Sequence, residues 1–501
     1  MSKDEIRIQY SGFIIFAAQM LSVTTGVVFT LLLTRNMTKP QYGIWSNIFD
    51  VMGYFTLLGG LFPFWATRFV ARGAKGAIKT GLLANLIVAL VSMAVYFPLI
   101  SVVTRAFYVS EAYGIVYLVG AVQIINVYMI SMLEGCLRAI KPQAIGYGLL
   151  IEEACKVSFA YVLIVGLHQL FLGAMISLIA SASVQTLYYI HLTAKDLREK
   201  IQWNYLKEWL KGSTANFYNA VGNQSAASIF ILLFLYGGQA ARGEYQAAVT
   251  FANVIGYSSF LAFALYPKLL TKNSLEEVTL SFKIVLMFAI PMAAIAISMS
   301  KSLLTILNVS YGAAWPVLVL LALDAVVVLI SQFYSSLVFG AERLDEKAKI
   351  PLNKLVRSKM FKVFTLPYIQ AAIALPTAYF ALTRLTNGQS LNAVLYVTTI
   401  SICVHAATLF ALYAIMRKSI RVSVPWRSIG KYLLISMVTA AVLYFLPHPT
   451  TIVLTLLVLA CGVAAYALLL LAIDLEARKL VALIWQEIKN IFHQIRKERP
   501  E

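Results

Sequence analysis

Long apolar stretches separated by short polar segments fill most of the chain. Roughly 20 residues of helix cross the hydrocarbon core of a bilayer, and lipid offers no hydrogen-bond partner to an open backbone. The pattern therefore predicts an all-α polytopic membrane protein with about fourteen transmembrane helices. The spans are expected near 11–34, 44–65, 80–104, 113–137, 143–167, 169–191, 213–236, 244–266, 278–299, 313–340, 363–383, 391–415, 430–446 and 451–473.

The polar segments alternate in charge along this series. Most of the 41 lysines and arginines fall in every second segment, beginning with the N-terminal one. This asymmetry follows the positive-inside rule and predicts an even number of spans in the plasma membrane, with both termini cytoplasmic. It also accounts for the net charge of +19, so that contact with membrane lipids explains the basic balance and a nucleic-acid partner is not required.

Composition agrees with this class. The chain is 60% hydrophobic and 13% charged, whereas soluble domains carry roughly 25% charged residues. The four cysteines lie in or beside apolar stretches, without metal-ligand spacing, so no metal site, cofactor or disulfide framework is expected.

The N-terminus lacks a small-residue cleavage site, so no removable signal peptide is expected. Glycosylation sequons at Asn36 and Asn308 fall on the predicted outer side.

The first half of the chain is echoed in the second. A shift of about 203 residues places Asp50 on Asn253 and Tyr54 on Tyr257, and later segments match at slightly smaller shifts. We interpret this as two pseudo-symmetric six-helix bundles in the same orientation, spans 1–6 and 7–12, with a cavity between them. The predicted units are an N-terminal bundle (1–194), an amphipathic linker (195–212), a C-terminal bundle (213–415), two added spans (416–473) and a basic amphipathic tail (474–501).

Three polar stripes lie inside expected spans. Their members recur three or four residues apart, on one face of a helix. Such groups are costly against lipid, so the stripes are expected to line a cavity, although interhelical hydrogen bonding is the alternative. The stripes comprise Asn47, Asp50 and Tyr54; Asn216, Asn219 and Asn223; and Thr250, Asn253 and Tyr257.

Further charges lie within or at the ends of the spans. Glu152, Glu153 and Lys156 are spaced for an ion pair, and they are equally open to a proton or cation relay or a head-group contact and to a structural role. Asp324 has no sequence-local partner and is a weaker candidate for ion or proton coupling, with a pair across helices as the alternative. Arg68 and Lys268 mark the cytoplasmic ends of the two related spans. They are expected to act as surface anchors, with a diphosphate-binding mouth as the alternative.

The stretch "LLTRNMTKPQYGIWSNIFDVMGYFTLLGGLFPFWATRFVAR", with "LNVSYGAAWPVLVLLAL" and "LVFGAERLDEK", resembles the polysaccharide and oligosaccharide repeat-unit flippases (Wzx-like). These belong to the multidrug/oligosaccharidyl-lipid/polysaccharide (MOP) exporter superfamily. The resemblance implies two bundles in a V around a cavity lined largely by spans 1, 2, 7 and 8. Unlike the lipid II flippase branch, these span interiors show only Asp50 as a charge.

The resemblance also implies transfer of a polyprenyl-(pyro)phosphate-linked oligosaccharide between leaflets for cell-surface polysaccharide assembly. We expect a non-enzymatic flippase working by alternating access, with no catalytic residues. Its expected partners are the lipid-linked glycan and glycan polymerase or transferase machinery. The alternatives are a cation-coupled exporter of drugs or metabolites and, from another class, a membrane-embedded glycosyltransferase or polymerase.

Overall fold

A computed structural model describes residues 3–259, 275–341, 358–418, 424–446 and 448–478. Within these ranges the chain forms helices joined by short turns, and no strand occurs. Twelve helical segments of the described chain are long and apolar enough to cross a membrane. The predicted all-α polytopic membrane fold is confirmed.

Two further expected spans account for the difference between twelve and about fourteen. The helix α6 (Gln143–Ala160) carries Glu152, Glu153 and Lys156, and α11 (Gln239–Gly256) carries Arg242 and Glu244. Their composition is therefore less apolar than that of the other spans, although both segments are helical. The second part of the span expected near 244–266 lies outside the described residues.

The first helix group runs from α1 to α7. In it α1 packs on α6, α3 and α4 pack on α5, and α7 packs on both α5 and α6. A capping box starts α2: the Thr38 hydroxyl accepts from the backbone N–H of Gln41, whose side chain accepts in return from the backbone of Thr38. The elements are α1 (Lys3–Asn36), α2 (Lys39–Thr56), η1 (Leu57–Gly60), α3 (Pro63–Ala71), α4 (Ala77–Ala106), α5 (Glu111–Ile140), α6, η2 (Tyr161–Gly166) and α7 (Leu170–Thr193).

A linker containing η3 (Asp196–Arg198) and α8 (Trp203–Gly212) leads to the second helix group, α9 to α18. Within this group α9 packs on α17, α11 and α18 pack on α15, and α17 packs on α18. The elements are α9 (Thr214–Ala227), α10 (Ile229–Leu232), η4 (Leu233–Gly237), α11, α13 (Leu275–Ser298), α14 (Ser300–Leu307), η7 (Val309–Ala314), α15 (Trp315–Ala341), α17 (Lys359–Arg384) and α18 (Ser390–Arg417).

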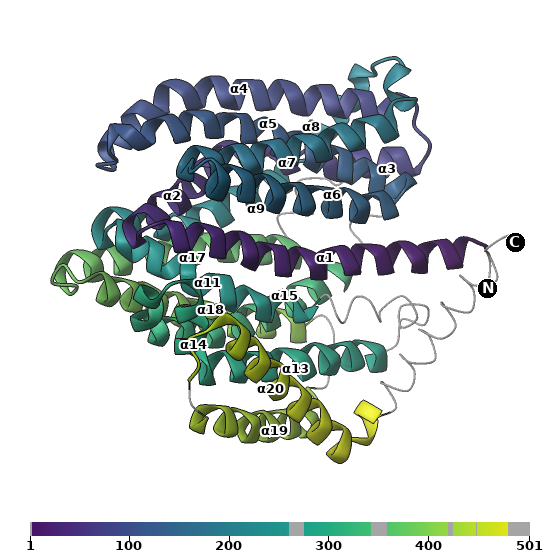
Figure 1. The fold of residues 1–501 in the computed structure, drawn as a ribbon. Helices are drawn as coiled ribbons and strands as arrows, with labels where there is room; N and C mark the ends of the chain where they lie inside the picture. The colour runs from purple at the N-terminus through teal and green to yellow at the C-terminus, as the bar shows by residue number, and fades with distance from the viewer. Residues whose placement is uncertain (1–2, 260–274, 342–357, 419–423, 447, 479–501) are drawn as a thin grey trace, which may run out of the picture.

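In Figure 1, α4, α5 and α7 of the first group lie above α1, and α13, α15 and α18 of the second group lie below it. They meet most extensively where α2 packs on α11. These two helices hold equivalent places in the two predicted repeats. The repeat itself, with its domain boundaries, stays a prediction.

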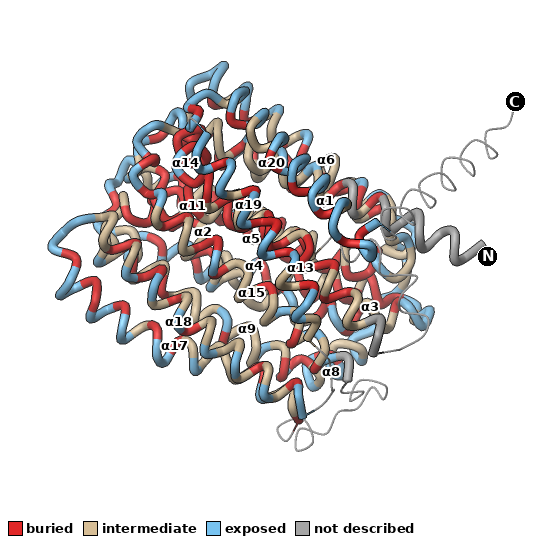
Figure 2. The backbone as a smooth tube through the Cα atoms, turned by 90° about the horizontal axis from the view of Figure 1, so that it is seen from below, coloured by how far each residue is buried: buried red, intermediate tan, exposed pale blue. Residues whose placement is uncertain are grey.

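The periphery of the molecule exposes many large apolar side chains. Figure 2 shows exposed positions along the outer faces of α17 and α18. Phe410 on α18 is 72% exposed, and Val102 on α4 and Leu456 on α20 are also exposed. Such a continuous apolar surface would be unfavourable in water and is suited to lipid.

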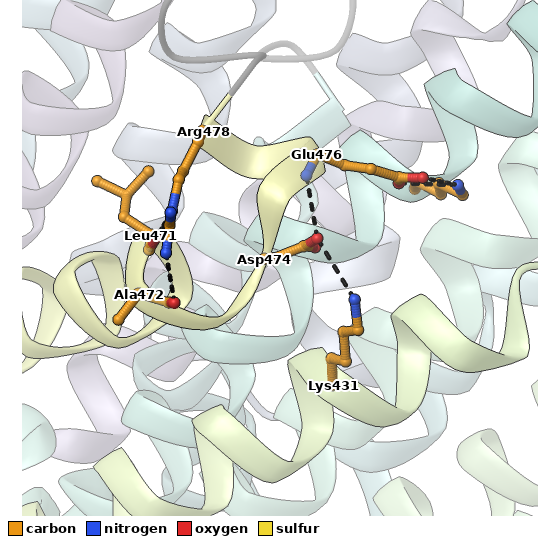
Figure 3. Close-up of polar contacts among 7 residues, drawn as sticks. Lys431, Leu471, Ala472, Asp474, Glu476 and Arg478 are labelled. Atoms are coloured by element: carbon orange, nitrogen blue, oxygen red, sulfur yellow. Dashed lines mark hydrogen bonds and ion pairs between the residues drawn. The ribbon is translucent and has the colours of Figure 1, made fainter.

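Two added helices, α19 (Trp426–Phe445) and α20 (Ile452–Ile473), pack beside α13. The Tyr466 hydroxyl donates to the Met287 carbonyl of α13 at 2.8 Å. Beyond the end of α20, Asp474 accepts a hydrogen bond from the backbone N–H of Glu476 and from Lys431 of α19 (Figure 3). These contacts fasten the end of α20 to α19 and α13, because Lys283 of α13 also pairs with Glu476 at 2.9 Å.

Candidate functional site

The crossing of α2 and α11 depends on two glycines. A Cβ at Gly43 would collide with the Gln239 carbonyl, and one at Gly243 would collide with the Lys39 carbonyl. The missing side chains therefore allow the two backbones to touch. We call this region the turn end, since α1 meets α2 there and η4 meets α11. The Lys39 ammonium also pairs there with the buried carboxylate of Glu244 at 2.5 Å.

The Asp50 side chain points from α2 to α11. Arg242 donates from Nε to Oδ2 at 2.7 Å and from Nη2 to Oδ1 at 2.9 Å, which is a bidentate ion pair. The two side chains are only 11% and 5% exposed. Arg242, which the sequence pattern places in a loop, instead belongs to the start of α11 and supplies the counter-charge of Asp50.

Other groups fix the Arg242 guanidinium. It donates to Gln246 at 2.9 Å and lies 5.1 Å from the centre of the Phe230 ring and 5.7 Å from that of Tyr245. Hydrogen bonds and aromatic faces together lower the cost of burying this charge. The Asp50–Arg242 pair thus joins the two helix groups through a contact whose geometry is fixed and whose charges balance.

Beside this pair lies a cavity of about 640 Å3, which we call the α11–α15 cavity. Among the described residues, Asp50 alone lines it from the first helix group. The polar groups that line it from the second group are Arg242, Tyr245, Gln246, Asn253, Tyr257, Ser259, Asp324 and Gln332. A cavity lined largely by spans 1, 2, 7 and 8 was expected; the described residues that line the α11–α15 cavity come mainly from the second group.

A second cavity of about 510 Å3, the α15–α17 cavity, adjoins the first. Val328 and Gln332 line both. Asn219 and Asn223 of α9 reach this second cavity, and Asn223 donates to the Asn219 backbone carbonyl at 2.9 Å. Asn216 is partly buried on the same helix and lines neither cavity.

The three polar side chains of the α2 stripe each contact a different part of the structure. Asn47 is fully buried and accepts a hydrogen bond from the Tyr117 hydroxyl of α5 at 2.8 Å, so its expected place on a cavity wall is wrong. Residues three apart on a helix differ in direction by about 60°, which is enough to separate Asn47 from Asp50. Tyr54 is exposed and its hydroxyl lies 2.6 Å from that of Ser228, across the two helix groups.

Asp324 of α15 finds its partner on α18. The Nδ1 atom of His405 lies 2.8 Å from one carboxylate oxygen of Asp324 and 3.0 Å from the other. Asp324 lines the α11–α15 cavity and His405 lines the α15–α17 cavity. This carboxylate–imidazole pair therefore lies in the wall between the two cavities.

A separate polar cluster lies between α1 and α6. The buried Glu153 accepts from the hydroxyls of Ser22 at 2.6 Å and Thr25 at 2.5 Å and pairs with Lys156 at 2.6 Å. Glu152 is half-buried on the adjoining face of α6. The contacts make Glu153 a structural junction, and they leave the expected relay role as a prediction.

Arg68, the predicted basic anchor that the structure describes, lines neither cavity. The Arg68 guanidinium lies 4.3 Å from the centre of the Phe64 ring and 5.4 Å from that of Trp65. Lys268 lies outside the described residues.

Sequence reasoning missed Arg242, His405 and the polar face of α15. Arg242 follows the glycine pair Gly237 and Gly238 in a polar stretch, which hydropathy assigns to a loop, but α11 begins directly after that pair. For His405 and the α15 serines no signal was available, because single hydroxyl and imidazole groups in apolar helices also satisfy their own backbone.

Comparison with known proteins defines the fold. No family model and no curated protein matches the sequence. The structure is similar to the lipid II flippase MurJ in an inward closed conformation, with a TM-score of 0.59, 14% identity, and 93% of this chain and 99% of that chain covered. It is similar to an inward-facing multidrug resistance MATE transporter, with a TM-score of 0.56, 13% identity, and 80% and 96% covered.

The structure is also similar to a MOP superfamily transporter from Pyrococcus furiosus, for which a reverse polarity of the binding pocket is described. The TM-score is 0.53 and the identity 12%, and 82% of this chain and 95% of that chain are covered. The chain is thus a multi-span membrane protein with the fold of the MOP superfamily. The solved structures named here are transporters and a flippase rather than enzymes, and their identities of 12–14% carry the fold alone.

Proposed function

We propose that this protein is a flippase that moves a polyprenyl-(pyro)phosphate-linked oligosaccharide between membrane leaflets for cell-surface glycan assembly. The observation that carries the proposal is the pair of adjoining cavities lined by amides and hydroxyls within a largely apolar helical body. A hydrated sugar cannot cross hydrocarbon unaided, since each unsatisfied polar group costs several kcal/mol there. These cavities offer the hydrogen bonds that water would otherwise supply.

The charges of the α11–α15 cavity support binding of the uncharged sugar part of the head group. Its acidic and basic side chains are paired, Asp50 with Arg242 and Asp324 with His405. A binding site for cationic drugs would profit from an uncompensated carboxylate, whereas neutral hydroxyl groups need donors and acceptors of low net charge. Asn253, which is exposed, and Gln246 fit that need.

Alternating access fits the contacts at the turn end. The Gly43 and Gly243 crossing, the Lys39–Glu244 pair and the Asp50–Arg242 pair all hold α2 against α11. We propose that the turn end faces the outside and both termini lie in the cytoplasm. The head group then enters from the cytoplasmic side while the polyprenyl tail stays in lipid, and release requires α2 and α11 to separate.

A cation-coupled exporter of drugs or metabolites is the second candidate. The Asp324–His405 pair favours it, because a carboxylate and an imidazole beside a cavity can exchange a proton or hold a cation. Drug efflux from cells carrying the gene, compared with cells in which it is deleted, distinguishes this function from flipping.

Reconstitution tests the flippase proposal. Proteoliposomes receive a fluorescent lipid-linked oligosaccharide, and the fraction accessible to a membrane-impermeant quencher is followed over time. Asn253→Leu is expected to reduce flipping about tenfold, since it removes an amide from the cavity wall and leaves sugar hydroxyls unpaired. Asn36→Leu is the matched control, because that exposed amide caps its own helix. Flipping by Asn253→Leu at the wild-type rate would rule out the cavity assignment.

A further inference from the structure

We infer that the α15–α17 cavity is a binding subsite for one uncharged sugar unit, held by the second helix group alone. This inference deepens the proposed function and rests on it for the biological cargo. The site itself is defined by its own geometry, since all the described residues that line it belong to α9, α15, α17 and α18. Its volume of about 510 Å3 lies in the range of roughly 300–1,000 Å3 typical of small-ligand sites.

Serine hydroxyls form one wall of this cavity. Ser331, Ser335 and Ser336 each donate to the carbonyl four residues earlier in α15, all at 2.9 Å. Each hydroxyl proton is thus already used, and the oxygen keeps lone pairs for an incoming donor. The wall consequently accepts hydrogen bonds along about one and a half turns of helix.

Amide groups provide the complementary donors. The side chain of Gln332 is exposed at the junction of the two cavities, and no partner for it occurs among the described residues. Across the cavity Gln370 donates to Thr408 at 2.9 Å, which orients its amide. A sugar hydroxyl both donates and accepts, so acceptors on one wall and amides on the others match it.

Apolar groups complete the lining. Phe339, Pro367 and Leu412 border the cavity, and Phe339 is 37% exposed. An aromatic ring beside hydrogen-bonding groups suits the alternating C–H and O–H surface of a pyranose. Among the described residues that line the cavity, His405 is the one ionisable residue, and its Nδ1 atom lies 2.8 Å from a carboxylate oxygen of Asp324. The described lining therefore offers mainly neutral hydrogen-bonding groups and not a cluster of like charges.

Cysteine protection tests occupancy directly. The four cysteines are free, so a cysteine-less background requires no disulfide to be broken. In that full-length background Ser335→Cys is labelled with a maleimide in the presence of maltose, mannobiose or diacetylchitobiose. Ser158→Cys is the matched control, since Ser158 is an exposed serine of α6 with the same hydrogen bond to the carbonyl four residues earlier.

At least one neutral disaccharide is expected to slow labelling of Ser335→Cys about fivefold or more without affecting Ser158→Cys. Inorganic phosphate at the same concentration is expected to have no effect. Absence of protection by all three sugars, or equal protection by phosphate, would overturn the inference.

Flipping assays separate this inference from the proposed function. Ser331→Trp fills the cavity, and Gln332→Leu removes the amide with little change of volume; each is expected to lower flipping about tenfold. If the tryptophan of Ser331→Trp prevents folding, Gln332→Leu still tests the subsite. Flipping at the wild-type rate by a folded variant of either kind overturns the subsite while the flippase function stands. A wild-type protein that flips no lipid-linked oligosaccharide refutes the function, and the labelling result then still decides the subsite.

Discussion

The buried ion pair between Asp50 and Arg242 makes a quantitative prediction. Replacing Asp50 by leucine leaves a guanidinium that is 5% exposed with no counter-charge, while Gln246 and two aromatic rings remain around it. Replacing Arg242 by leucine leaves the carboxylate in the same position. Replacing both residues gives an apolar contact between α2 and α11.

The expected magnitudes follow from the burial and geometry of the pair. Removing one partner of a buried, hydrogen-bonded ion pair costs about 3–5 kcal/mol of folding free energy. Insertion scales give a comparable cost, about 2.5–3.5 kcal/mol for an unpaired charge at the centre of a span. Replacement of a whole buried pair by apolar residues is often neutral, so the double variant is expected to recover most of the loss.

The assay is unfolding of the purified proteins in one detergent, followed by tryptophan fluorescence. Asp50→Leu and Arg242→Leu are expected to unfold at clearly lower temperature than the wild type, and Asp50→Leu/Arg242→Leu close to it. Glu111→Leu is the control, because this exposed acid at the start of α5 lies away from the pair. The reasoning fails if Asp50→Leu is as stable as Glu111→Leu, or if the double variant is no more stable than either single one.

The remaining predictions concern other contacts. Gly43→Ala is expected to lower thermal stability measurably, because its Cβ forces α2 away from the Gln239 carbonyl, whereas Gly26→Ala on α1, with open space at its Cβ, is expected to be neutral or stabilising in the same melt. Glu153→Leu is expected to cost about 3 kcal/mol in a denaturant titration, because Lys156 loses its buried counter-charge, and wild-type stability would contradict the role of Glu153 as a junction. Tyr466→Phe is expected to cost about 1 kcal/mol in that titration through the lost hydrogen bond to Met287, and an unchanged midpoint would show that this hydrogen bond does not stabilise the attachment of α20.

The sequence predicted the helices better than the directions of their side chains. Apolar length is a local property, so the spans could be located without knowing their neighbours. Partner choice is not local: Asp50 and Arg242 are 192 positions apart, and only the crossing of α2 and α11 brings them together. The burial of Asn47 against Tyr117 likewise depends on α5, which a helical stripe does not identify.

Polar groups that fall on one helix face were recognisable, but polar walls made from several helices were not. The α15–α17 cavity combines serines of α15 with amides of α9 and α17 and the imidazole of α18. Each group alone is ordinary in an apolar helix, because its own backbone can satisfy it. Only their convergence in space indicates a binding surface.

The attachment of α19 and α20 has a practical consequence for measuring motion. Because Tyr466 and the Lys283–Glu476 pair tie these helices to α13, a spectroscopic label on the exposed Leu456 travels with the second helix group. A second label on the exposed Val102 of α4 travels with the first. The distance between the two labels then reports how far the two groups rock relative to each other. Because both labels lie outside the cavities, a bound cargo does not contact them.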